Sequence, residues 1–308
     1  MKANRVHQFG PPEVILFEEV ERPVPAENEV LVRVKAAGVG PWDAWVRAGK
    51  SALPQSLPLT LGADLSGTVV GLGSKVRGFE PGQQVFGVTN ARFTGAYAEY
   101  AVATATMIAE KPANLSHVQA GAVPVVAVTA WQMVFDLGRV KAGDRVLVHG
   151  GGGAVGSLAV QLSTSARARV IGHDVKAAMD YVERLGAEAV DAGSLRFEDG
   201  LEPVDVVIDT VGGDTLARSF SVLKPGGVLI SSVSQPDQDE ARRRGVRAVF
   251  MIVNVTTSAL TRVAELLDHG NLEVRIGAVL PLSEARRAHE MLEGFRPRAP
   301  GKIVLESA

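Results

Sequence analysis

The sequence predicts an α/β protein of two domains, one irregular and rich in β-strands, the other built on a doubly wound parallel sheet. Residues 1–110 contain short β-type runs broken by glycine and proline, with little helical periodicity. From about Gln119, strand-like runs alternate with helical stretches, which is typical of a parallel sheet covered by helices. Between one such strand and the next helix lies a run of four glycines, Gly150–Gly153.

The composition limits the class of protein. A chain of 308 residues with 46% hydrophobic and 21% charged residues is long enough for two domains and a large core. The net charge of −2 provides no basic field for nucleic acid or for an anionic membrane. The absence of cysteine excludes disulfides, thiolate nucleophiles, iron–sulfur clusters and sulfur-ligated zinc. The first residues lack an apolar signal core and no apolar run reaches spanning length, so we expect a soluble, cytoplasmic protein.

The strands of the first domain are expected in the segments EVLVRVKAAGV, LSGTVVGLG, QQVFGV and AYAEYAVA. Those of the second domain are expected in VLVHG, RVIGHD, EAVDA, DVVIDTVGG and GGVLISS. Near the end, TTSALTRVAELLDHG places Leu260, Val263 and Leu267 on one helical face, with Gly270 as its C-cap. Ser283 is expected to cap a helix over EARRAHEMLEG. The closing GKIVLES is predicted to be a strand that returns to the first domain.

The glycine run has the flanks of a nucleotide cradle. Before it, Val146–Val148 form a short apolar run that indicates a buried parallel strand. After it, one helical face carries Val155, Leu158, Ala159 and Leu162. Gly151, Gly153 and Gly156 satisfy the spacing G-x-G-x-x-G, in which the glycines allow a tight turn, close approach to a pyrophosphate and close helix packing. The helix N-terminus would supply free N–H groups to the phosphates.

Several segments occur in the order and spacing of one known family: FGPPEV, LPLTLGADLSGTV, GAYAEYAVA, VTAWQMVFD, HGGGGAVGSLAVQL, VIDTVGGDTL, LKPGGVLIS and GKIVL. Over essentially its full length the chain resembles the zinc-free quinone oxidoreductase (zeta-crystallin-like) branch of the medium-chain dehydrogenase/reductase superfamily. The resemblance implies a GroES-like catalytic domain over residues 1–121, completed by 273–308, around a Rossmann nucleotide-binding domain over 122–272. It places the active site in the cleft between the two domains. One departure is Gly153–Ala154, where the family usually has two glycines.

The resemblance also bears on metal chemistry. Zinc alcohol dehydrogenases of the superfamily hold the metal with two cysteines and a histidine, and the aligned positions here are Gly40, Ala63 and Val125. None of these side chains binds a metal, and the four-cysteine structural zinc loop is missing. Without a Lewis acid, the expected hydride acceptor is already electron-poor: a quinone or an α,β-unsaturated carbonyl. We therefore predict a zinc-independent NAD(P)H-dependent oxidoreductase acting on such compounds.

The choice between NADH and NADPH depends on Asp174. This residue ends the second strand 18 residues after Gly156, where an acidic side chain binds the ribose 2′-hydroxyl and repels a 2′-phosphate. The family usually has a small residue there and uses NADPH, and relatives often carry a tyrosine where this chain has Ala192. His173 and Lys176 lie close enough in sequence to offset part of that repulsion. The alternative is that Asp174 caps a helix starting near Lys176, and both cofactors stay open.

By resemblance, the remaining cofactor contacts come from several loops. The expected cofactor-binding residues are Thr129, Gly151, Gly152, Gly153, Ala154, Val155, Gly156, His173, Asp174, Lys176, Val211, Gly212, Ser232, Val233, Met251 and Ile252. Val211 and Gly212 are expected at the adenosine. The residues expected at the nicotinamide are Thr129, Ser232, Val233, Met251 and Ile252. No metal site is expected.

On the substrate side, the expected cleft-lining residues are Gly40, Trp42 and Thr129. A polar asparagine often occupies the position of Gly40 in relatives. Trp42 and Trp45 either form an aromatic wall for a flat acceptor or belong to the core. Asp43 is expected to be a structural residue of its turn. Neither Tyr97 nor Tyr100 is expected to donate a proton, which solvent can deliver.

Two functions other than an enzyme stay open. One is a non-catalytic NAD(P)H-binding redox sensor. The other is an RNA-binding moonlighting protein, suggested by Arg242, Arg243, Arg244 and Arg247, although one basic loop on a slightly acidic protein is a poor nucleic-acid footprint. Relatives commonly dimerise through the outer strands of their Rossmann sheets. The apolar segment RAVFMIVNV therefore predicts a homodimer. Neither nucleic acid nor a membrane is expected as a partner.

Overall fold

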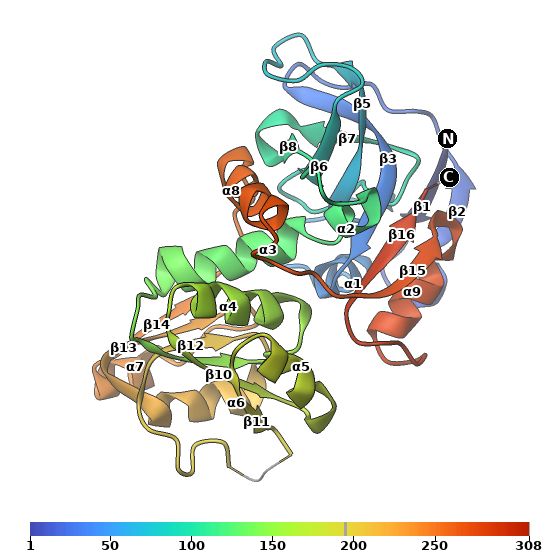
Figure 1. Cartoon of the computed structure of the whole chain (residues 1–308). Helices are drawn as coiled ribbons and strands as arrows, with labels where there is room; N and C mark the ends of the chain where they lie inside the picture. The colour runs from blue at the N-terminus through green and yellow to red at the C-terminus, as the bar shows by residue number, and fades with distance from the viewer. Residues whose placement is uncertain (194–195, 308) are drawn as a thin grey trace. The chain divides into compact units, whose positions relative to one another are not determined.

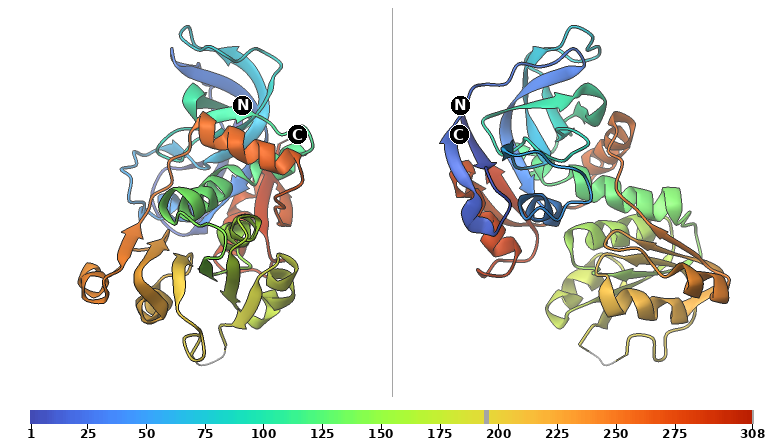
Figure 2. Two further views of the ribbon diagram at one scale, coloured as in Figure 1. Left: turned by 60° about the vertical axis from the view of Figure 1, so that its left-hand side comes forward. Right: turned by 180° about the vertical axis from the view of Figure 1, so that it is seen from behind.

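The computed structural model describes residues 1–193 and 196–307, which form two compact units. Unit 1 comprises residues 1–125, 255–270 and 274–308, and unit 2 comprises residues 126–254 and 271–273. Figure 1 shows the β-rich unit 1 and the layered unit 2. Both ends of the chain lie in unit 1, as the marks N and C in Figure 2 show.

Unit 1 contains two sheets. A three-stranded sheet has the order β2–β1–β4, with β1 Lys2–Val6, β2 Leu16–Glu19 and β4 Leu59–Thr60. The seven-stranded sheet has the order β15–β16–β3–β5–β6–β8, and β7 pairs with β3. Its strands are β3 Glu29–Val39, β5 Asp64–Leu72, β6 Gln84–Val88, β7 Tyr100–Thr104, β8 Ile108–Glu110, β15 Ile276–Pro281 and β16 Lys302–Glu306. The last strand pairs antiparallel with β3, with Val304 opposite Gly38, so the expected return of the chain is confirmed.

The helices of unit 1 are short. They are α1 Pro41–Arg47, α2 His117–Gly121, α8 Thr257–Asp268 and α9 Ala285–Leu292, and α3 Pro124–Trp131 begins at the end of its first segment. The expected inner face of α8 is confirmed, because Leu260, Val263 and Leu267 are buried. This helix, which the expected boundaries place in the nucleotide-binding domain, groups with unit 1, and Thr257 Oγ1 donates a 2.7 Å hydrogen bond to the Ile108 carbonyl.

One expectation for the C-terminal region is wrong. Ser283 does not cap α9, because a 3₁₀ turn over Leu282–Glu284 precedes the helix and puts Glu284 at the N-cap position. The turn carries Leu282 into the core of unit 1, where it packs with α9 residues Ala285 and Ala288. Burial of this leucine, rather than a side-chain cap, sets the start of the helix.

Unit 2 is a six-stranded parallel sheet of order β11–β10–β9–β12–β13–β14. Its strands are β9 Arg145–His149, β10 Arg169–Asp174, β11 Glu188–Asp191, β12 Val204–Asp209, β13 Leu223–Ser231 and β14 Arg247–Phe250. In chain order this is 3-2-1-4-5-6, the Rossmann arrangement, in which the strand order reverses between β9 and β12. The predicted doubly wound parallel sheet is confirmed.

Helices cover both faces of this sheet. The helices α4 Ala154–Ser165 and α5 Met179–Arg184 lie on one face, and α6 Gly213–Arg218 and α7 Gln238–Arg244 lie on the other (Figure 1). The strands between them are apolar on both sides, with Val146, Leu147 and Val148 of β9 at most 1% exposed. With both faces covered, the carboxyl edge of the strands is where polar side chains and loops gather.

Candidate functional site

The glycine run forms a tight loop between β9 and α4. Gly150 has φ +75°, in the left-handed region, and its N–H donates to the His173 carbonyl at 2.8 Å. The tight turn thus belongs to Gly150, one residue before the motif, rather than to Gly151 as the motif suggests. A Cβ at Gly156 would lie 2.0 Å from the Gly150 carbonyl oxygen, so only glycine lets α4 approach the loop this closely. Gly153 is the N-cap of α4, which leaves the first N–H groups of that helix available.

Asp174 is tied to this loop. One carboxylate oxygen accepts a hydrogen bond from the Gly152 N–H at 2.7 Å, and the other accepts one from the Val175 N–H at 2.6 Å. The 3₁₀ turn that follows begins at Lys176 with Val175 as its N-cap and has no side-chain cap. The alternative that Asp174 caps this turn is therefore wrong. Its negative charge lies instead beside Gly152, between the first two glycines of the motif.

A row of buried polar side chains crosses the sheet at its carboxyl end. His173, His149, Asp209 and Ser231 are in register on four adjacent strands. The two histidines contact each other through Nδ1 atoms 2.9 Å apart, and Ser231 Oγ donates to Asp209 at 2.6 Å. The residue pattern of each strand did not reveal this row, because it depends on how the strands align.

Asp209 holds the loop after β12. Its second carboxylate oxygen accepts hydrogen bonds from the N–H groups of Val211 at 3.1 Å and Gly212 at 2.9 Å. Gly212 has φ +78°, which fits the conformation that this double contact requires. The Val211 side chain is left 51% exposed at the edge of the sheet.

The next two loops are tied to the same row. The Ser232 N–H donates to the Asp209 carbonyl, the Val233 N–H to Ser231 Oγ and the Met251 N–H to the Ser231 carbonyl. Met251 is buried and Ile252 is 53% exposed. Apart from Thr129, which is buried in α3, the expected cofactor residues thus lie at the carboxyl ends of β9, β10, β12, β13 and β14, in the loops that follow them, or in the first turn of the helix after the loop.

Of the expected substrate-side residues, Gly40 and Trp42 lie in unit 1 at the start of α1, whereas Thr129 lies in α3 within unit 2. A Cβ at Gly40 would lie 2.3 Å from Cζ2 of Trp42, so the indole fills the place of a side chain at position 40. Trp42 is half-buried, with its ring 4.7 Å from Lys302 Nζ. Trp45 is 44% exposed, so a place in the core is wrong for this tryptophan.

Two buried carboxylates lie close to these residues. Asp43 accepts hydrogen bonds from the Gly40 N–H at 2.8 Å and from Tyr97 Oη at 3.0 Å, both on Oδ2, which confirms its structural role in the turn. Its Oδ1 has no partner among the described residues. Burial raises the pKa of Asp43 to about 7.

Asp64 is the second of these carboxylates. It accepts the Val125 N–H at 2.9 Å and lies 3.4 Å from Lys302 Nζ, and burial raises its pKa. No local sequence pattern predicts the pair Asp64–Lys302, whose residues are 238 positions apart. The available signal was an aspartate within the apolar LGADLSG segment.

Two of the three positions aligned with zinc ligands contribute backbone hydrogen bonds to buried carboxylates. The N–H groups of Gly40 and Val125 satisfy the two buried carboxylates. The third position, Ala63, is fully buried and apolar. Among residues 1–193 and 196–307, no group of three or more histidine, aspartate or glutamate side chains is placed to hold a metal ion.

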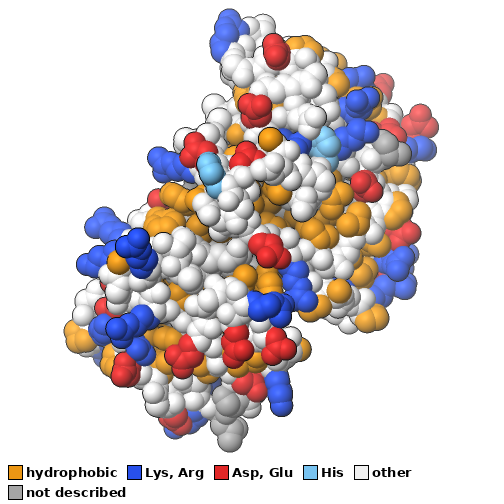
Figure 3. Space-filling view, viewed as in Figure 1, with side chains coloured by type: hydrophobic (Ala, Val, Ile, Leu, Met, Phe, Trp, Pro, Cys, Tyr) orange, Lys and Arg blue, Asp and Glu red, His pale blue; other side chains and the backbone are white. Residues whose placement is uncertain are grey.

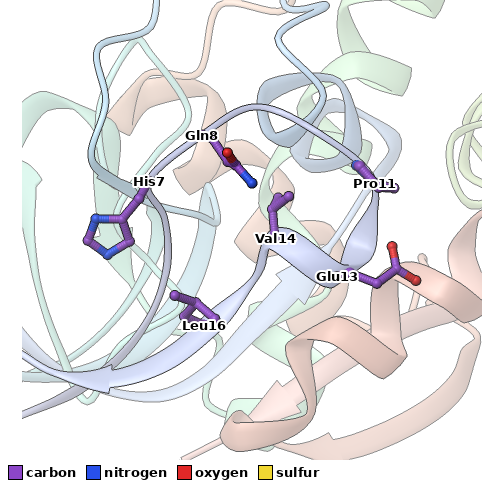
Figure 4. A pocket seen from close by; sticks show the side chains of 6 residues that line it. All are labelled: His7, Gln8, Pro11, Glu13, Val14 and Leu16. Atoms are coloured by element: carbon purple, nitrogen blue, oxygen red, sulfur yellow. The ribbon is translucent and has the colours of Figure 1, made fainter.

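Other surface features of the described residues do not add to this site. A hollow of about 450 Å³ lies around the 3₁₀ turn Pro12–Val14 (Figure 4). It is lined by His7, Gln8, Pro11, Glu13, Val14 and Leu16. None of these is an expected site residue, and His7 is paired with Glu18 at 2.9 Å.

The arginine cluster of α7 is neutralised locally. Arg242 pairs with Asp239, and Arg243 and Arg244 both pair with Glu240. On the face seen in Figure 3, basic and acidic side chains are interspersed. This arrangement does not favour the RNA-binding alternative. No helix in the described part of the chain has the length and apolar character needed to span a bilayer.

Comparison with known proteins identifies the family. Residues 26–113 match the family described as alcohol dehydrogenase GroES-like domain, and residues 185–305 match zinc-binding dehydrogenase. The quinone oxidoreductase of Lama guanicoe is 30% identical over 323 residues, covering 99% of this chain and 97% of its own. The solved structure of the quinone oxidoreductase from Coxiella burnetii has a TM-score of 0.93 at 34% identity, covering 99% of both chains. The Escherichia coli quinone oxidoreductase complexed with NADPH has a TM-score of 0.89 at 26% identity, covering 99% of this chain and 100% of its own. The chain therefore belongs to the quinone oxidoreductase branch of the medium-chain dehydrogenase/reductase superfamily.

Proposed function

We propose that the protein is a zinc-independent NAD(P)H oxidoreductase that reduces quinones or α,β-unsaturated carbonyls. The observation that carries the proposal is the side-chain-free loop Gly150–Gly153, with Asp174 beside it, at the carboxyl edge of the parallel sheet. The names of relatives support the same reaction, because the proteins from Lama guanicoe and Coxiella burnetii are quinone oxidoreductases.

The residues present fit a nicotinamide dinucleotide. The loop Gly150–Gly153 leads into the N-terminus of the 12-residue α4, whose first N–H groups would bind the pyrophosphate. Asp174 would accept hydrogen bonds from the adenosine ribose, with Val211 and Gly212 beside the adenosine. The residues proposed at the nicotinamide end are Thr129, Ser232, Val233, Met251 and Ile252. When bound, the nicotinamide supplies the hydride.

The protein's contribution to the reaction is then orientation and hydrogen bonding. Gly40, Ala63 and Val125 have no side chain that could hold a Lewis acid, so an electron-poor acceptor suits this chain better than a simple alcohol. We propose Gly40, Trp42 and Thr129 as the residues that face the acceptor, with Trp42 offering its half-buried indole to a flat ring. Solvent delivers the proton to the reduced acceptor.

The test of this function is the oxidation of NADH or NADPH by a panel of simple quinones and enones. The reaction is monitored through the loss of absorbance of the reduced cofactor. Steady turnover with at least one acceptor is expected, and pretreatment with EDTA should leave the rate unchanged. Binding of the cofactor without turnover would favour the redox-sensor alternative. Loss of activity that added zinc restores would overturn the zinc-independent assignment.

We also propose that the protein is a homodimer that pairs through β14. This strand, Arg247–Phe250, ends the order of the six-stranded sheet, and Ala248, Val249 and Phe250 are only partly buried. An apolar strand with an unpaired edge invites pairing with a second copy. Sedimentation at micromolar concentration should give the mass of a dimer. The N–H of Met251 donates to β13, and N–H groups alternate along a strand, so the N–H of Ala248 points to the free edge. Replacing Ala248 with proline should shift that mass to the monomer, whereas a wild-type monomer would contradict the proposal.

A further inference from the structure

The two histidines of the polar row form a buried pair beside the proposed cofactor site. His149 ends β9 and is fully buried, and His173, next to Asp174 on β10, is 6% exposed. Their Nδ1 atoms are 2.9 Å apart, and the Phe197 ring lies against both imidazoles with centroid distances of 4.8 and 4.9 Å. Neither ring contributes to the proposed hydride transfer.

A chain of hydrogen bonds determines where each proton of the pair lies. Ser219 Oγ donates its only proton to the Thr215 carbonyl at 2.7 Å. The 2.9 Å contact between His149 Nε2 and Ser219 Oγ therefore requires that His149 carry its proton on Nε2. Burial lowers the pKa of His149 to about 3, so this ring is neutral and its Nδ1 is an acceptor. His173 must then carry a proton on Nδ1.

The remaining nitrogen, His173 Nε2, is left as an acceptor. Burial lowers the pKa of His173, so the ring is neutral at neutral pH and Nε2 holds a lone pair. No described residue is hydrogen-bonded to this atom. Turning Nε2 into a donor would place two Nδ1 lone pairs against each other, unless His149 and Ser219 both reversed their hydrogen bonds. The chain Thr215–Ser219–His149 thus fixes His173 in one tautomer.

The surroundings of this acceptor suit a flat aromatic base. β9 lies between β10 and β12, and the side chains of Val175, after β10, and Val211, after β12, are 59% and 51% exposed. Two exposed apolar side chains on either side of the end of β9 can sandwich a ring. Asp174, next to His173, marks the adenosine ribose in the proposed function, so the base of the same nucleoside falls within reach of this region.

We propose that His173 Nε2 accepts a hydrogen bond from the exocyclic amino group of the adenine base and selects adenine dinucleotides over 6-oxopurine dinucleotides. The inference rests on the proposed cofactor function and adds a base-reading residue to it. Hypoxanthine has a carbonyl oxygen in place of the amino group, so it would set acceptor against acceptor. A buried polar group left without its partner is what makes such discrimination strong.

The experiment measures equilibrium binding, by calorimetry or cofactor fluorescence, of NADH and of its hypoxanthine analogue, deamino-NADH. The 2′-phosphorylated pair replaces them if NADPH binds more tightly. We expect the wild-type protein to bind the adenine form at least about fivefold more tightly. His173→Phe keeps a ring against Phe197 but removes the acceptor. The affinities of this variant for the adenine and hypoxanthine forms should therefore differ by less than about twofold.

A second variant tests the tautomer chain without touching His173. Ser219→Ala removes the acceptor of the His149 proton, so the pair can exchange tautomers and the ratio should fall while the affinity for NADH changes less than the ratio does. Asp174→Ser is the control, since it should alter ribose binding and leave the base ratio unchanged. A wild-type ratio within twofold, or a ratio that survives His173→Phe, overturns the inference. Failure to bind either adenine dinucleotide overturns the proposed function itself.

Discussion

In the variant Asp174→Ser, the ratio of kcat/KM for NADPH over NADH is expected to rise by at least about tenfold. The Asp174 carboxylate lies beside the Gly152 N–H, and it would repel a 2′-phosphate on the ribose that it is proposed to bind. Its removal leaves Lys176, in the following turn, free to pair with that phosphate. A charge-assisted hydrogen bond is worth roughly 1.5–3 kcal/mol, and each 1.4 kcal/mol corresponds to about tenfold in affinity.

The ratio is the proper readout, because the same substitution weakens the glycine loop for both cofactors. Serine is too short to keep both hydrogen bonds that Asp174 accepts from Gly152 and Val175. Asp174→Asn keeps the length and one acceptor oxygen but loses the charge. It therefore separates the repulsion of the 2′-phosphate from the hydrogen bonding that holds the glycine loop. Asp191→Ser is the matched control, since Asp191 is in register with Asp174 at the end of β11. A ratio within about twofold of wild type in Asp174→Ser would show that the carboxylate only holds the loop.

The variant Asp43→Asn is expected to be more stable than wild type at about pH 8, by roughly 2–4 kcal/mol of unfolding free energy. The pKa of Asp43 rises from 3.8 to about 7 in the folded protein because the carboxyl group is fully buried. Between these two pH values the folded state binds a proton that the unfolded state has released, so the stability of the wild type falls as the pH rises through this window. Each unit of pH contributes up to about 1.4 kcal/mol.

Asparagine imitates the protonated acid. Its amide oxygen can accept the hydrogen bonds from Gly40 and Tyr97, and its amide nitrogen takes the place of the unpartnered Oδ1. Denaturant unfolding at several pH values should give curves that converge near pH 4 and separate above it. Asp64→Asn provides the contrast, since it leaves buried Lys302 without its carboxylate partner and should destabilise the protein across the range. A loss of stability in Asp43→Asn at high pH would show that Lys302 needs the ionised form of Asp43 as well.

Local patterns in the sequence were sufficient for the architecture of unit 2. The apolar run Val146–Val148 and the glycine spacing that ends at Gly156 identified strand, loop and helix, because burial and the absence of a Cβ leave direct traces in residue type. The same holds for the inner face of α8, whose buried residues recur with helical spacing. The position of Asp174 at a strand end also followed from the sequence, since the alternation of strands and helices fixes which edge of a parallel sheet it occupies.

Only the tertiary structure decided what several polar side chains do. Asp43 meets Tyr97, Asp64 meets Lys302, and His173 meets His149 through pairings of strands or turns that are remote in the sequence. The tight turn lies at Gly150 rather than at Gly151 because the loop is hydrogen-bonded to the neighbouring strand. The start of α9 differs from the predicted one because Leu282 enters the core. A buried polar group must find a partner, and the choice of that partner depends on register and packing between segments, which no local pattern records.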